Sequence, residues 1–126
     1  MKLHITDEFS PLQDVIVCWG DSVPDYKIYA PNEPEFTKYH KRSWDKHLFL
    51  KQQEQFFKKL SSFDVRLHFL KTEPDLPHQM YTRDTGFVIN DHLYYSKKRE
   101  FSDRDGEIHL LQNLLTSLKI TDLREI

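Results

Sequence analysis

The chain has 126 residues, a formal net charge of −2 and three glycines, at positions 20, 86 and 106. The length suits one domain of about 100–200 residues. The scattered glycines exclude a Walker A loop and a Rossmann fingerprint, because both need clustered glycines beside a phosphate. The near-neutral charge gives no field that would recruit nucleic acid or an anionic membrane, so we expect neither as a partner.

Cysteine content and hydropathy place the protein among water-soluble chains. Aromatic residues make up 13% of the sequence, which argues against intrinsic disorder. Cys18 is the single cysteine, so no disulfide can form within the chain. No apolar run approaches the ~18 residues of a membrane span, and the first residues do not form the apolar core of a signal peptide. We therefore expect a cytoplasmic protein.

The first half of the sequence predicts a strand, a long loop and a helix. Residues 14–19 form a β-branched apolar run, which is typical of a buried strand. Residues 20–40 contain three prolines and no periodicity, so we expect a loop there. Ser43 is the expected N-cap of a helix over residues 44–61. Its predicted apolar face is formed by Trp44, Leu48, Phe49, Phe56, Leu60 and Phe63.

The second half predicts a strand, a hairpin, a helix and a last strand. Residues 64–70 alternate, with Val65, Leu67 and Phe69 on the side expected to be buried. Two strand-like runs, 86–89 and 92–95, flank an Asn-Asp pair that suits a tight hairpin. Ser102 is the expected N-cap of the second helix, and residues 119–126 alternate as a strand. This order predicts an α/β fold. The apolar face of the second helix comprises Ile108, Leu111, Leu114, Leu115 and Leu118.

The sequence gives little support for a metal site or for a cysteine nucleophile. The seven histidines have neither an i, i+4 pair nor a neighbouring cysteine, so we expect no zinc site and no cofactor. Residues 103–106 imitate part of a calcium loop, but Phe101 and Gln112 would fill its first and twelfth ligand positions and cannot ligate. Cys18 lies in the apolar strand run, where a small hydrophobic role is expected. The alternative is that Cys18 is the nucleophile of an unrelated hydrolase.

An Arg-Asp pair, Arg83-Asp84, directly precedes the apolar strand 86–89. A carboxylate at that point would lie at the mouth of a sheet, where ligands bind. The alternative interpretation is an ion pair within a surface loop, since such pairs are common.

Three segments of the sequence resemble one family of enzymes. Residues 80–91, MYTRDTGFVIND, resemble the Phe-Thr-Arg-Asp-Pro-(Gly/Phe)-x-Val-Ile-Gly-Asp signature of the guanidino-group-modifying superfamily. This superfamily includes arginine deiminase, dimethylarginine dimethylaminohydrolase and the amidinotransferases. Thr85 replaces the usual proline and Asn90 a glycine. Residues 9–17 resemble the opening strand of the family, and residues 99–111, with Arg104-Asp105-Gly106-Glu107, resemble its Arg-x-x-Glu helix start.

The resemblance implies a fold and three site residues. The family has the pentein fold, an α/β propeller of five ββαβ-like modules, so residues 1–126 would be the N-terminal portion of the catalytic domain, roughly its first two modules. Asp84 matches the aspartate that binds the substrate guanidinium. Arg104 matches the arginine that grips the substrate carboxylate in the dimethylarginine-hydrolase branch. For Arg83 we expect a supporting structural role.

The catalytic histidine and cysteine of the family would follow the position that matches Ile126. The resemblance therefore implies a chain that binds a small guanidino compound but does not turn it over. The alternative is a non-catalytic binding or regulatory module that keeps the guanidine pocket or pairs with a second chain. Unpaired strand edges would also favour a homo-oligomer or a complementing chain. Arginine, methylated arginine and agmatine share the guanidinium, so the sequence leaves open both the substrate and the choice between hydrolase and amidinotransferase.

Overall fold

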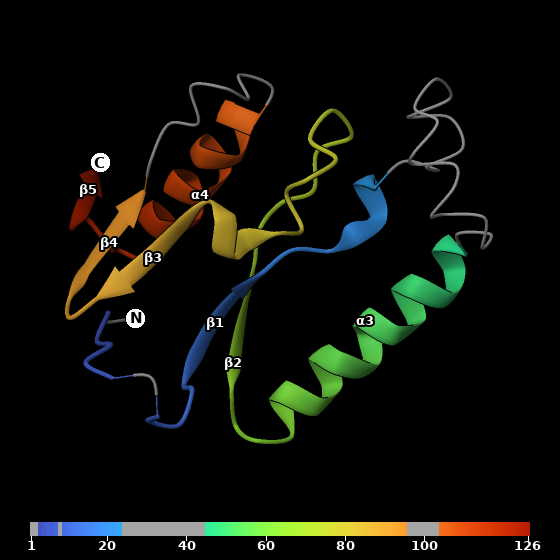
Figure 1. Cartoon of the computed structure of the whole chain (residues 1–126), viewed down its shortest axis with the longest axis horizontal. Coiled ribbons are helices and arrows are strands. Elements are labelled where there is room, and N and C mark those ends of the chain that lie inside the picture. The colour runs from blue at the N-terminus through green and yellow to red at the C-terminus, as the bar shows by residue number, and fades with distance from the viewer. Residues whose placement is uncertain (1–2, 8, 24–44, 96–103) are drawn as a thin grey trace, which may run out of the picture.

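The computed structural model describes residues 3–7, 9–23, 45–95 and 104–126, and Figure 1 shows their arrangement. The expected N-caps Ser43 and Ser102 and most of the predicted loop 20–40 lie outside these residues. The described elements, in chain order, are β1 (Asp14–Val17), η1 (Gly20–Ser22), α3 (Lys46–Ser61), β2 (Arg66–Phe69), η2 (Thr82–Asp84), β3 (Gly86–Ile89), β4 (His92–Tyr95), α4 (Asp105–Ser117) and β5 (Leu123–Glu125).

Strands β1 and β2 form a two-stranded parallel sheet, and α3 makes the connection between them. The register pairs Asp14 with Arg66, and the two side chains form a double hydrogen bond of 2.9 and 2.6 Å. His68 Nε2 also lies 2.6 Å from Asp14 Oδ1. Burial raises the pKa of Asp14, but the hydrogen bonds from Arg66 and His68 outweigh this effect and hold that pKa below its ordinary value. These contacts fix the start of the parallel register.

Helix α3 begins two residues later than predicted. Its N-cap is Asp45, whose carboxylate accepts a 2.9 Å hydrogen bond from the Leu48 amide. Phe57 is the buried residue of the helix and packs edge-on against Trp19 and Phe69. The predicted apolar face was therefore wrong at three positions, and its member Trp44 lies outside the described residues. The exposed positions are Leu48 (49%), Phe56 (57%) and Phe63 (66%).

Strands β3, β4 and β5 form the second sheet, in that order. The predicted hairpin is confirmed: β3 and β4 are antiparallel, with Ile89 opposite His92, and Asn90 in the turn has a left-handed φ of 53°. Helix α4 then crosses back so that β5 pairs parallel with β4. The second sheet is thus a ββαβ unit. In the described residues, β1, α3 and β2 repeat its last three elements.

Helix α4 ends in a Schellman motif. The amide of Ile120 donates to the carbonyl of Leu115 at 2.9 Å, and the amide of Lys119 donates to that of Thr116 at 3.0 Å. Lys119 takes the left-handed conformation that the motif requires, with φ 59°. The motif turns the chain toward β5 and brings Ile120 back to the core.

The main core lies between the two sheets and α4. Leu115 is fully buried, and the residues around it come from both halves of the chain. The shared core makes the two sheets one packed unit rather than two separate ones. Its buried members are Leu3, Cys18, Leu70, Leu93, Leu111, Leu115 and Ile120.

The predicted alternation of strand 64–70 holds only in part. Val65 is buried as expected, but Phe69 is 42% exposed, and Leu70, on the opposite side, is 4% exposed. Within β2, Leu67 and His68 are half-buried and Arg66 and Phe69 are exposed, and Leu70, directly after the strand, joins the main core. A one-sided alternation is therefore the wrong description of β2.

Candidate functional site

Asp84 lies at the end of the 3-10 turn η2, immediately before strand β3. The turn is closed by a 2.9 Å hydrogen bond from the Asp84 amide to the Tyr81 carbonyl. It is also tied to β1, because Thr82 Oγ1 donates to the Ile16 carbonyl at 3.1 Å. These bonds hold a carboxylate whose side chain is 43% exposed at the junction between the two sheets.

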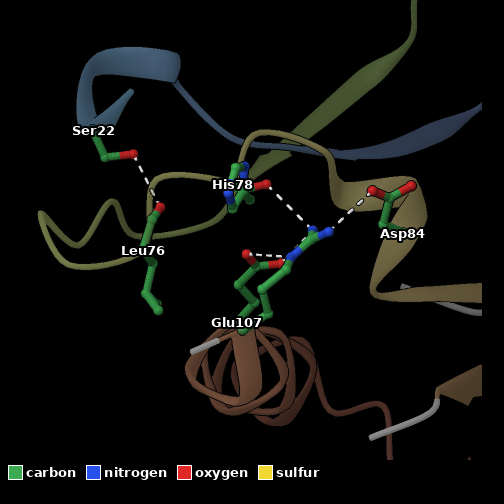
Figure 2. A network of polar contacts seen from close by, with 6 residues as sticks. Ser22, Leu76, His78, Asp84 and Glu107 are labelled. Atoms are coloured by element: carbon green, nitrogen blue, oxygen red, sulfur yellow. Dashed lines mark hydrogen bonds and ion pairs between the residues drawn. The ribbon is translucent and has the colours of Figure 1, made fainter. Parts of the chain in front are cut away.

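Arg104 reaches the same point from the start of α4, twenty residues further along the chain. Its Nη1 lies 3.3 Å from Asp84 Oδ2. Its Nε and Nη2 donate to the two carboxylate oxygens of Glu107, at 2.9 and 2.8 Å. Figure 2 shows Asp84 and Glu107 on different sides of this guanidinium. The structure therefore brings the predicted site residues Asp84 and Arg104 into contact.

Asp84, Arg104 and Glu107 form a cluster, here called the Asp84 cluster, in which two carboxylates face one guanidinium. The hydrogen bonds from Arg104 to Glu107 raise the pKa of Arg104 further, against the opposing effect of burial. Glu107 is 2% exposed, so its charge requires a partner. The cluster thus has an excess of negative charge at Asp84, its exposed end, and can attract a cation there.

A buried glutamine organises the loop that faces Arg104. Gln79 is 1% exposed, and its Nε2 donates to Ser22 Oγ at 2.9 Å and to the Glu73 carbonyl at 3.1 Å. Ser22 Oγ in turn donates to the Leu76 carbonyl at 3.3 Å (Figure 2). The loop fixed in this way presents the His78 carbonyl, which lies 3.5 Å from Arg104 Nη2.

Arg83 and Cys18 lie outside the cluster. The side chain of Arg83 is exposed and makes no hydrogen bond or ion pair with the residues that the structure describes, so its supporting role stays a prediction. Cys18 is 1% exposed. Burial, aided by the charges of Asp21 and Glu107, raises the pKa of its thiol to about 12. The thiol is therefore protonated at neutral pH, as the inert interpretation expects.

A cleft of about 660 Å³ opens between η1 and α3. It shares no residue with the Asp84 cluster, and acidic and basic side chains both line it, so its charge does not select a ligand. Its lining residues are Trp19, Asp21, His47, Leu50, Lys51 and Glu54. Among the described ranges, no group of three or more His, Cys, Asp or Glu side chains could hold a metal ion. In the same ranges, no helix is long and apolar enough to cross a membrane.

Sequence reasoning missed two residues of the site. Glu107 was noted as part of the Arg-x-x-Glu helix start, but not as a partner of Arg104. Its spacing of i, i+3 from Arg104 on a helix was the available signal. Gln79 gave no signal, because its partners Ser22 and Glu73 come from positions that only the folded chain brings together.

Comparison with solved structures finds the same fold. A variant of AgrE bound to L-arginine matches with a TM-score of 0.67 and 18% identity, over 93% of this chain and 16% of that one. A dimethylarginine dimethylaminohydrolase adduct with S-methyl-L-thiocitrulline matches with a TM-score of 0.67 and 13% identity, over 92% and 42%. A variant of the dimethylarginine dimethylaminohydrolase of Pseudomonas aeruginosa, in complex with citrulline, matches with a TM-score of 0.63 and 13% identity, over 91% of this chain and 42% of that one.

Sequence comparison alone finds no relative: no protein-family model matches this chain, and no curated protein does. The structural matches confirm the predicted fold class, a partial pentein fold of α/β type. The chain spans less than half of the length of each of these solved proteins.

Proposed function

We propose that this chain is part of a guanidino-modifying enzyme and binds the guanidinium of a small substrate through Asp84. One observation carries the proposal: Asp84 Oδ2 already accepts a hydrogen bond from a guanidinium, that of Arg104, at 3.3 Å. Carboxylates orient this planar cation well, because their two oxygens match its paired donors. The partial pentein fold supports the same conclusion, since the matching proteins include complexes with L-arginine and citrulline.

In this proposal Arg104 receives the carboxylate of an arginine-like ligand. Its guanidinium is held firmly by Glu107 and less closely by Asp84. The Nη1 edge, which Asp84 contacts, is therefore the part of Arg104 that a ligand would engage. A ligand with a guanidinium and a carboxylate would give Asp84 and Arg104 each a new partner of opposite charge.

The Asp84→Asn variant tests the proposal. We expect it to weaken the binding of L-arginine by about tenfold or more, because one charge-assisted hydrogen bond contributes about 1.5–3 kcal/mol. Titration calorimetry or NMR chemical-shift mapping on the 126-residue chain measures the change. Asp122→Asn is the matched control, since it removes the same charge from an exposed position and should bind like wild type. Equal affinity of the two variants would contradict the proposal.

We further propose that the chain alone does not turn over guanidino compounds, because Cys18 is unsuited to attack a guanidinium carbon. Only a thiolate is nucleophilic, and a pKa of about 12 leaves Cys18 almost wholly protonated. We expect no labelling by a thiol reagent at pH 8 in the folded state, full labelling in denaturant, and no release of citrulline or ammonia from L-arginine. Rapid labelling of the folded chain would favour the alternative of an unrelated cysteine hydrolase.

A further inference from the structure

The buried carboxylate of Glu107 has a different relation to Arg104 from that of Asp84. Glu107 lies in the first turn of α4, where the helix N-terminus favours negative charge. It contacts the side of the guanidinium formed by Nε and Nη2, with both distances below 3.0 Å. Asp84 contacts Nη1 with a single oxygen at 3.3 Å. The side chains of Glu107 and Asp84 are 2% and 43% exposed.

The donors of Arg104 are nearly all engaged. A guanidinium has five N–H groups, and four hydrogen bonds join this one to Glu107, Asp84 and the His78 carbonyl. A ligand carboxylate can therefore gain a full contact with Arg104 only by replacing one of these acceptors. The contact to Asp84 is a single hydrogen bond of 3.3 Å to an exposed carboxylate, so we expect it to cost least to open; the 3.5 Å contact to the His78 carbonyl is longer but partly buried. The contact to Glu107 is short, paired and buried, and opening it would leave an unpaired charge in the interior.

Building on the proposed function, we propose that Glu107 is a positioning residue that holds Arg104 while a ligand carboxylate replaces Asp84 at Nη1. The two hydrogen bonds from Arg104 to Glu107 fix both the position and the rotation of the guanidinium, because two parallel hydrogen bonds define a plane. They also remove most of the side-chain freedom that Arg104 would otherwise lose when the ligand binds. Asp84 is released at the same step and becomes available to the guanidinium of the ligand.

The proposal predicts selective effects on two probes that differ in one group. L-Arginine carries both a guanidinium and a carboxylate, whereas agmatine carries the guanidinium alone. Glu107→Gln keeps the size of the side chain but removes the charged, paired contact. We expect this variant to bind L-arginine about tenfold more weakly and agmatine with nearly unchanged affinity. Glu54→Gln, an exposed glutamate on α3 that pairs with Lys58, is the control and should bind both like wild type.

A second measurement uses the wild-type chain, so it does not depend on the folding of a variant. The NMR signal of the Arg104 Nε–H group, assigned by its loss in Arg104→Lys, reports on the contact with Glu107 directly. We expect this signal to be protected from solvent exchange and to stay in place when L-arginine is added. A merely structural role of Glu107 in α4 would predict no difference between the two probes in Glu107→Gln.

The outcomes separate this inference from the proposed function. If wild type binds neither L-arginine nor agmatine, the proposed function fails, and the inference fails with it. If wild type binds both but Glu107→Gln loses neither or loses both equally, the positioning role is overturned and the proposed function stands. A large shift of the Arg104 Nε–H signal on addition of L-arginine would also overturn it, because the ligand would then be displacing Glu107.

Discussion

Replacing Leu115 by alanine should lower the free energy of unfolding by about 3–4 kcal/mol. The side chain is 0% exposed and lies in the main core between α4 and the two sheets. Truncation of a buried leucine removes its transfer free energy and leaves a cavity, which together cost about 2–5 kcal/mol. In a chain of this length the loss corresponds to a fall in Tm of about 10–15 °C, measurable by calorimetry or circular dichroism.

The position of Leu115 in the core also predicts how the variant unfolds. Because the main core includes Cys18 and Leu70, which directly follow the two strands of the first sheet, and Leu93 from the second sheet, the transition should stay single and shift as a whole. Leu12→Ala is the control, since Leu12 is 58% exposed and its truncation should cost less than 1 kcal/mol. A loss below 1 kcal/mol for Leu115→Ala, or two separate transitions, would contradict the shared core.

Replacing Arg104 by methionine should cost about 3 kcal/mol at pH 7. The methionine fills much of the space of the arginine stem but leaves the carboxylate of Glu107 buried without its paired donor. Removing one partner of a buried ion pair typically costs about 3–5 kcal/mol. We place the expected value at the lower limit because 14% of the Arg104 side chain is exposed. Chemical denaturation of the variant and wild type measures the difference.

Two further measurements identify the unpaired charge as the cause. Protonation of Glu107 in Arg104→Met removes that charge, so the stability gap to wild type should narrow as the pH falls from 7 toward 4. The double variant Arg104→Met/Glu107→Leu should recover most of the loss at pH 7. Arg66→Met is the matched control, because Arg66 is 68% exposed and its pair with Asp14 should contribute less than 1 kcal/mol. A gap that does not change with pH would point to lost packing instead.

The elements whose conformation is set by residues close together in the sequence could be predicted. The hairpin turn at Asn90 and the spacing of Ile108, Leu111 and Leu115 on α4 were confirmed, because a turn and an amphipathic face are defined within a few residues. Helix α3 shows where such patterns fail. Two adjacent phenylalanines, Phe56 and Phe57, fit the helical period about equally well, and only the ring contacts with Trp19 and Phe69 decide which one is buried.

The residues of the candidate site could be predicted from the sequence, but their arrangement in space could not. Asp84 and Arg104 were identified through their motifs, yet nothing in the sequence places them 3.3 Å apart. That distance depends on the parallel return of β5 beside β4 and on the attachment of η2 to β1 through Thr82. The role of Glu107 follows only once Arg104 is known to be buried beside it.

The left-handed turns have a consequence for how the glycines are used. None of the three glycines has a positive φ; they occur where the chain is crowded, and a Cβ on Gly86 would lie 2.8 Å from the backbone oxygen of Tyr94. The left-handed positions described instead hold Asp64, Asn90 and Lys119. For an ordinary residue that conformation costs about 1–2 kcal/mol. Asp and Asn tolerate this conformation, so the cost falls mainly on Lys119, and a glycine at that one position should stabilise the end of α4 without altering the core.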